Sequence, residues 1–236
     1  MEPVAMHMSD GLINAPTSLL FVVVAVAGLS IAAWRARSEL DERTAPMAGL
    51  VAAFIFAVQM VNFPILPGVS GHLLGGALAA ILVGPYTGML CVSIVLIVQA
   101  LLFADGGLTA LGANITNMAI IGVVVGYGVA VALRPLVVRQ QRLRLRVLGG
   151  LAFAAALCGT VAASMGFVLE YAIGGHATSG DSTSLGAVAA YMLGAHVLIG
   201  IGEGLITAVT VTAVAKARPD LVYLLRTAPR RVEVRA

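Results

Sequence analysis

The sequence predicts an all-α polytopic membrane protein with about seven transmembrane helices. Of its 236 residues, 60% are hydrophobic and 11% are charged, whereas a soluble domain carries about 25% charged residues. The mean hydropathy is +1.01. Apolar runs recur along the chain, and the basic residues lie between or after them. A net charge of +3 placed at helix ends does not indicate nucleic-acid binding.

Seven apolar runs are candidates for helices that span a bilayer, at about 20 residues for each span. We expect these spans at residues 17–34, 45–61, 72–84, 86–103, 108–133, 147–172 and 185–215. Ser70 is a suitable N-cap for the third run. That run is short, because it covers only about 20 Å of helix. It is therefore expected to begin below the outer surface, which would bury His72 within the protein.

The distribution of positive charge predicts the orientation. All 14 Lys and Arg residues follow the first, fifth or seventh span. They are Arg35, Arg37, Arg43, Arg134, Arg139, Arg142, Arg144, Arg146, Lys216, Arg218, Arg226, Arg230, Arg231 and Arg235. Basic segments remain on the cytoplasmic side, so we expect the N-terminus outside and the C-terminus in the cytoplasm of a cell (inner) plasma membrane protein. The predicted outer segments contain acidic but no basic residues, and such a face attracts cations.

The predicted organisation is one membrane domain over residues 1–215, which begins with a polar segment at residues 1–16. A basic cytoplasmic tail at residues 216–236 follows. The tail contains Leu221, Val222, Leu224 and Leu225. We expect this short amphipathic stretch to lie on the anionic inner leaflet.

Histidines are the main candidate functional groups. His7, His72 and His176 are expected on the outer side, and His196 near the middle of the last span. Glu203 follows His196 on the same helix face. Ionisable residues inside a membrane are functional candidates, and a structural pair that grips a neighbouring helix is the alternative. Imidazole suits zinc, copper and nickel, although the histidine spacing alone is a weak signal.

An intramembrane serine protease is a rival interpretation. Gly68-Val69-Ser70-Gly71 matches a Gly-x-Ser-Gly motif, and His196 would be the base of a Ser–His pair. The neighbouring His72 has no role in that scheme. The sequence contains no Gly-x-x-x-x-Gly-Lys-Ser/Thr loop, so we expect a transporter subunit that is not an enzyme and whose ATP chemistry belongs to a partner. A metal-independent channel or secondary carrier is a further alternative.

Four segments resemble the CbiM/NikM family, the substrate-specificity subunits of cobalt and nickel energy-coupling factor (ECF) transporters. These segments are Met6–Gly11, Pro67–Gly76, Phe103–Asn114 and His196–Gly204. The resemblance implies capture of Co²⁺ or Ni²⁺ outside the cell as a transported substrate, with no organic cofactor. It implies as partners a transmembrane coupling (T) subunit, two cytoplasmic ATPase subunits and, in many systems, a small accessory membrane subunit.

The same resemblance implies a contact between the second span and the coupling subunit. Ala48, Ala52, Ala53 and Ala57 form overlapping small-xxx-small pairs in this span. Such spacing lets membrane helices approach closely, and ordinary packing within the bundle is the alternative.

The resemblance implies a metal site formed by Met6, His7 and His72. The ligands would be the amine of Met6, the amide and imidazole of His7, and the imidazole of His72. Five residues precede Met6, so an amine ligand requires that the mature chain begin at Met6. Otherwise the site lacks its amine, and His176 is the reserve ligand. Four nitrogens in a plane suit nickel(II) or copper(II) better than zinc, which prefers a tetrahedron.

Two polar residues are expected to support this site. Ser70 and Asp10 are placed in the sequence to orient the imidazoles. Neither the choice between cobalt and nickel nor the roles of His196 and Glu203 follow from the sequence.

Overall fold

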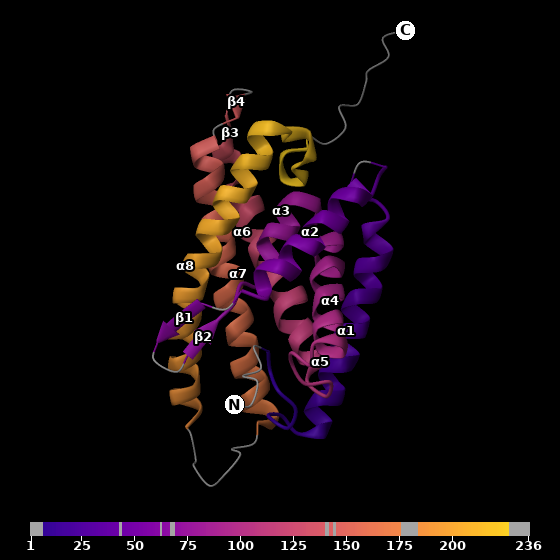
Figure 1. The fold of residues 1–236 in the computed structure, drawn as a ribbon, viewed down its shortest axis with the longest axis vertical. Helices are drawn as coiled ribbons and strands as arrows, with labels where there is room; N and C mark the ends of the chain where they lie inside the picture. Colours follow the sequence, from indigo (N-terminus) through magenta and orange to yellow (C-terminus); the bar gives the residue numbers. More distant parts are fainter. Residues whose placement is uncertain are drawn as a thin grey trace.

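The computed structural model describes residues 7–42, 44–61, 63–66, 69–139, 142–143, 145–175 and 184–226. Within these residues the fold is a helical bundle with two short antiparallel hairpins (Figure 1). Its helices are α1 (Ala15–Ala36), α2 (Thr44–Gln59), α3 (Gly76–Val83), α4 (Pro85–Leu102), α5 (Leu111–Asn114), α6 (Gly122–Val137), α7 (Leu145–Gly174) and α8 (Leu185–Ala217). The hairpins pair β1 (Phe63–Leu66) with β2 (Val69–Gly71), and β3 (Val138–Arg139) with β4 (Arg142–Leu143).

Membrane-spanning helices are supported by length and composition. In the described residues, five segments are long and apolar enough to cross a bilayer: α1, α4, α7, α8 and the continuous segment from Leu111 to Val137. Helix α2 is a shorter apolar helix. Large apolar side chains such as Leu19, Val26 and Trp34 of α1 are exposed. Contiguous apolar surface of this kind fits lipid rather than water, so the chain is a membrane protein.

Helix α3 lies at the centre of the bundle, and all eight of its residues are buried. It contacts α2, α4, α6, α7 and α8. The prediction that this helix begins near residue 72 with Ser70 as its N-cap is wrong. The helix begins at Gly76, and its N-cap Gly75 has a φ of +81°. The reason is a long-range contact: Glu203 accepts hydrogen bonds from the N–H groups of Leu74 and Gly75.

The predicted span at residues 108–133 is one continuous helical segment with an internal change of winding. A π-helical stretch, Ile115–Ile121, separates α5 from α6. Such wide turns are rare and often occur at functional sites. Asn114 directly precedes this stretch and Asn117 lies within it. Both side chains are buried, so the change of winding coincides with two polar groups inside the bundle.

The described part of the C-terminal tail packs against the protein. Short 3₁₀ turns at Pro219–Leu221 and Tyr223–Leu225 follow α8. Val222 and Leu224 are buried in the main apolar core, and Nη2 of Arg134 donates a hydrogen bond to the carbonyl of Arg226 at 2.8 Å. The expectation that this stretch lies on a lipid leaflet is therefore wrong for Val222 and Leu224, because they cover the bundle end.

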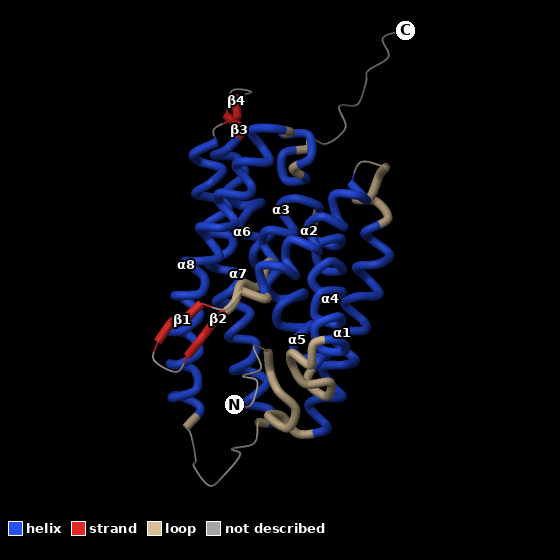
Figure 2. Tube along the Cα trace, in the orientation of Figure 1, coloured by secondary structure: helices blue, strands red, loops and turns tan. Residues whose placement is uncertain are grey.

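The bundle has two distinct ends. Residues 37–42, the β3–β4 hairpin and the 3₁₀ turns after α8 lie at one end (Figure 1). Residues 7–14 and the turn between α4 and α5 lie at the other end (Figure 2). The three arginine-rich regions of the sequence therefore share one end, and the N-terminal His7 segment lies at the opposite end.

Candidate functional site

The N-terminal segment folds back against the bundle, and Asn114 holds it there. The N–H of Met8 donates to Oδ1 of Asn114 at 3.1 Å, and Nδ2 of Asn114 donates to the Met8 carbonyl at 3.2 Å. The N–H of Gly107 donates to the same carbonyl at 2.9 Å. Paired polar groups of this kind fix a buried backbone. Met8 and its neighbour His7 are therefore held beside α5.

Asp10 anchors the same segment to the turn after α4. Its Oδ1 accepts hydrogen bonds from the hydroxyl of Thr109 and from the Thr109 N–H, the latter at 2.8 Å. These bonds, led by the one from the hydroxyl, lower the pKa of Asp10 below its ordinary value. The predicted role of Asp10 in orienting an imidazole is thus not what the structure displays, because its carboxylate is bound to Thr109.

The structure brings His7 and His72 together. Their ring centroids lie 4.6 Å apart with an angle of 59° between the ring planes. Each residue is only 7% exposed. Within the described residues, Nδ1 and Nε2 of His7 are both buried without a hydrogen-bond partner, which is uncommon for polar atoms inside a protein. A ligand that accepts the lone pair of an imidazole nitrogen would account for such a position.

A carboxylate that the sequence analysis did not identify lies next to His7. Oδ1 of Asp105 is 3.3 Å from Nδ1 of His7, and Asp105 is 8% exposed. The turn that carries Asp105 follows Ala104, whose φ is +52°, and includes Gly106 at +90°. A Cβ added at Gly106 would lie 2.9 Å from Cβ of His7. The Asp-Gly-Gly sequence indicates a turn at Asp105. Only the tertiary structure shows that this turn lies beside His7.

The hydrogen bond of His72 fixes its tautomer. Nδ1 of His72 lies 3.0 Å from the carbonyl oxygen of Leu73. A carbonyl only accepts, so Nδ1 carries the proton and Nε2 carries the lone pair. His196 has the same arrangement, because its Nδ1 lies 2.9 Å from the Met192 carbonyl. Both imidazoles thus present Nε2 as the nitrogen that can ligate a metal.

One cavity of about 330 Å³ joins these groups. Its lining includes three histidines, His7, His72 and His196, and three methionines, Met8, Met118 and Met192. No Asp or Glu is among the described residues that line it. Imidazole nitrogen and thioether sulfur suit late first-row transition metals, whereas Ca²⁺ and Mg²⁺ require oxygen ligands. The lining also includes Asn114, Asn117, Ser164 and Tyr191, so the cavity combines these nitrogen and sulfur donors with neutral oxygen donors.

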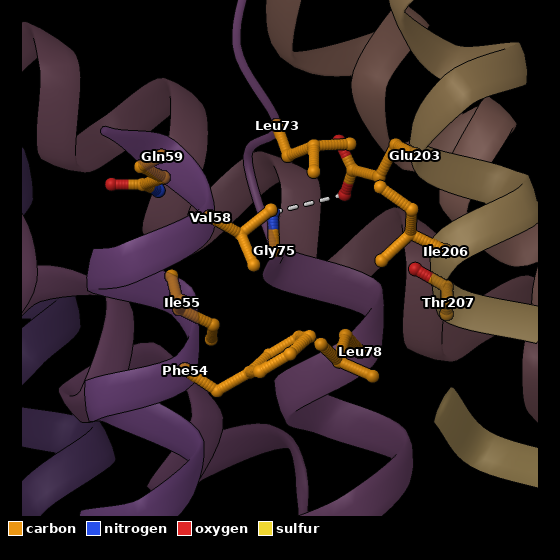
Figure 3. A pocket seen from close by; sticks show the side chains of 10 residues that line it. All are labelled: Phe54, Ile55, Val58, Gln59, Leu73, Gly75, Leu78, Glu203, Ile206 and Thr207. Carbon is orange, nitrogen blue, oxygen red and sulfur yellow. Dashed lines mark hydrogen bonds between the residues drawn. The ribbon is translucent and has the colours of Figure 1, made fainter. Parts of the chain in front are cut away.

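Side chains of three helices hold the turn after His72, and Figure 3 shows the bond from Gly75 to Glu203. Glu203 of α8 accepts from the N–H groups of Leu74 and Gly75, at 2.9 Å in each case. Thr160 of α7 donates to the same carboxylate at 2.8 Å. Nε2 of Gln59, the last residue of α2, donates to the Leu74 carbonyl at 2.8 Å. Glu203 was singled out from the sequence, but its partners lie up to 129 positions away.

Several expected site residues are outside what the structure describes. Met6 and His176 belong to segments that are not described, and only the backbone of Ser70 is described, where it pairs with Pro64 in the first hairpin. Of the three predicted metal-site residues, the structure therefore places His7 and His72. His196 is brought to the same cavity, and it is not paired with Glu203 in the described hydrogen bonds.

The fold and the cavity define a helical membrane protein in which three histidines line one cavity. The sequence matches the family of cobalt uptake substrate-specific transmembrane regions, CbiM, over residues 7–221. The chain belongs to this family.

Relatives and a solved structure agree with this assignment. A chain of Haloquadratum walsbyi, provisionally named a metal transport protein, is 38% identical over 92% of this chain and 94% of its own length. A provisionally named fused nickel transport protein NikMN of Archaeoglobus fulgidus is 40% identical over 92% of this chain and 68% of its own length. The crystal structure of a truncated transition metal transporter superposes with a TM-score of 0.73 and 27% identity, covering 90% of this chain and 99% of that chain.

Proposed function

We propose that this protein is the substrate-binding membrane subunit of an ATP-driven ECF importer, and that it captures Co²⁺ or Ni²⁺ on the outer side. The observation that carries the proposal is the approach of His7 and His72, whose rings lie 4.6 Å apart in a cavity without carboxylate lining among the described residues. Two imidazoles favour a transition metal over the abundant hard cations, which prefer oxygen ligands.

The proposed ligands are the amine of Met6, the amide and imidazole of His7, and the imidazole of His72. The first three would form two fused chelate rings, and the fourth would complete a plane of nitrogens. Nickel(II) accepts this geometry, whereas zinc prefers a tetrahedron. The Asp105 carboxylate, 3.3 Å from Nδ1 of His7, would place negative charge beside the bound cation.

The proposed orientation places the His7 end of the bundle outside. Its support is the gathering of the arginine-rich segments at the opposite end (Figure 1), because basic loops are retained in the cytoplasm. In this arrangement α2 and α3 complete seven spans, one membrane domain covers residues 1–215, and residues 216–236 form a cytoplasmic tail. The host membrane would be the cell (inner) plasma membrane.

The proposed transport cycle depends on partners. A transmembrane coupling subunit and two cytoplasmic ATPase subunits would supply the energy, with a small accessory membrane subunit in some assemblies. Uptake by vesicles that contain the complete complex should then require internal ATP hydrolysis. Uptake that continues without ATP would instead support a secondary carrier.

The metal site is tested by N-terminal sequencing of the purified protein together with titration of Ni²⁺ and Co²⁺. The variants His7→Ala and His72→Ala should each weaken binding by at least about 100-fold, or about 2.7 kcal/mol, because each removes a ligand. A protein that begins at Met1 and binds with full affinity would refute the amine ligand. Normal affinity in both histidine variants would refute the site.

A further inference from the structure

The peptide group between Leu73 and Leu74 connects His72 to Glu203. Its carbonyl, from Leu73, faces Nδ1 of His72 at 3.0 Å. Its N–H, from Leu74, donates to Oε2 of Glu203 at 2.9 Å. A trans peptide is planar, and its carbonyl and N–H point in opposite directions. The acceptor that holds the N–H therefore also sets the direction of the carbonyl that orients the imidazole.

The next peptide group is held in the same way. Its N–H, from Gly75, donates to Oε1 of Glu203 at 2.9 Å, and its carbonyl, from Leu74, accepts from Gln59 at 2.8 Å. A side chain at residue 75 would be strained at the observed φ of +81°, and its Cβ would lie 2.9 Å from Ile55. Both oxygens of Glu203 thus hold two consecutive peptide groups, Leu73–Leu74 and Leu74–Gly75. Figure 3 shows the second of these bonds, from Gly75 to Glu203.

The carboxylate is well suited to hold this turn. Glu203 is only 2% exposed, and three donors reach it, one of them the hydroxyl of Thr160. A buried carboxylate is tolerated only when it is paired in this way. The carboxyl group also lies at the N-terminus of α3, where the helix dipole favours negative charge.

We propose that Glu203 is a positioning residue for His72: through the Leu73–Leu74 peptide it sets the orientation and tautomer of the imidazole that binds the metal. The inference rests on the proposed metal site. It is a longer version of the carboxylate–histidine–metal arrangement, in which an outer group fixes the tautomer and raises the basicity of the ligand. Here a peptide group stands between the carboxylate and the imidazole. Glu203 would control metal affinity without contacting the metal.

The test compares Glu203→Gln with Glu39→Gln in the purified full chain. Both carboxylates are buried, Glu203 at 2% and Glu39 at 4% exposure. Both accept from two consecutive backbone N–H groups, but those that Glu39 accepts from belong to Tyr86 and Thr87, at the opposite end of the bundle from His7. Outer-group substitutions typically cost about 10–100-fold in metal affinity. We expect that loss for Co²⁺ or Ni²⁺ with Glu203→Gln, together with a shifted visible absorption band of the bound metal. Glu39→Gln should retain both properties.

If Glu203→Gln does not accumulate as folded protein, a second pair of variants provides the test. Thr160→Val removes one donor from Glu203 without touching the turn, and Thr160→Ser retains the hydroxyl. Thr160→Val should weaken binding and shift the absorption band, and Thr160→Ser should restore both. Wild-type affinity and spectrum in folded Glu203→Gln, or in Thr160→Val when Glu203→Gln is not obtained, would overturn the inference.

The histidine variants distinguish a failure of the proposed role of Glu203 from a failure of the proposed metal site. If His7→Ala and His72→Ala lose binding while Glu203→Gln does not, only the role of Glu203 fails. If the histidine variants also bind normally, the metal site itself fails.

Discussion

Gly106 is the position where a single methyl group should disturb the proposed metal site most directly. Its φ is +90°, and a Cβ there would lie 2.9 Å from Cβ of His7 and 3.3 Å from Nδ2 of Asn114. Gly106→Ala therefore combines backbone strain with a collision against two groups that hold the N-terminal segment. Gly11→Ala is the matched control, because Gly11 has a φ of +81° and no atom within 4 Å of an added Cβ.

The two variants allow the cost of backbone strain to be separated from the cost of the collision. An L-residue in the left-handed region costs about 1–2 kcal/mol, and this contribution is common to both variants. Inserting a methyl group into a packed site costs about 1–3 kcal/mol more, and only Gly106→Ala incurs it. If His7 moves to relieve the collision, that difference appears as weaker metal binding. At 1.4 kcal/mol for each factor of ten, the expected loss is about 5–150-fold.

The assay is titration of the purified variants with Ni²⁺, accompanied by thermal unfolding without metal. Gly106→Ala should lose affinity, whereas Gly11→Ala should unfold at a lower temperature than the wild type but bind normally. Equal metal affinity in the two variants would refute the reasoning, because the contact with His7 would then have no influence on the site.

Two further predictions concern the membrane and the partner subunit. In a background in which the exposed Cys158 is replaced, Gly180→Cys should react with an impermeant thiol reagent in intact cells and Gln140→Cys should not; the opposite result would invert the proposed orientation. On α2, Ala53 is exposed whereas Ala52 packs partly against the core. Ala53→Leu should therefore reduce recovery of the complex with the coupling subunit and leave metal binding intact, whereas Ala52→Leu should mainly lower stability. Full recovery of the complex with Ala53→Leu would exclude this helix face as the contact.

The helices were largely predictable, because the bilayer imposes simple rules. Backbone groups in lipid must bond within their own helix, so long apolar runs such as residues 147–172 predicted α7 (Leu145–Gly174) closely. The short run at 72–84 was less successful, since α3 begins only at Gly76. The start of α3 depends on hydrogen bonds to Glu203, which is remote in the sequence. Capping rules consider only residues close in the sequence, so they do not include such a partner. The β1–β2 hairpin between Phe63 and Gly71 was also not predicted.

The candidate site was likewise predicted from the sequence only in part. The residue types and the Ser-Gly-His and Met-His segments were sufficient to select His7 and His72 as candidate ligands. Of the predicted supporting groups, Asp10 binds Thr109, and Asp105 lies beside His7 instead. The predicted role of Ser70 concerns a side chain outside the described part of the structure. Both aspartates are in short polar turns, and which of them approaches an imidazole depends on how two loops pack.

The sequence by itself determined that the chain is a helical membrane protein, that its arginine-rich segments are separated from the His7 segment, and which histidines are candidate ligands. Hydropathy and charge act residue by residue, so these properties are readable before folding. The tertiary structure decided that His7 and His72 lie 4.6 Å apart and that Glu203 holds the turn beside His72. Those contacts join residues more than 60 positions apart, and they exist only when the packed helices bring their polar groups within hydrogen-bond distance.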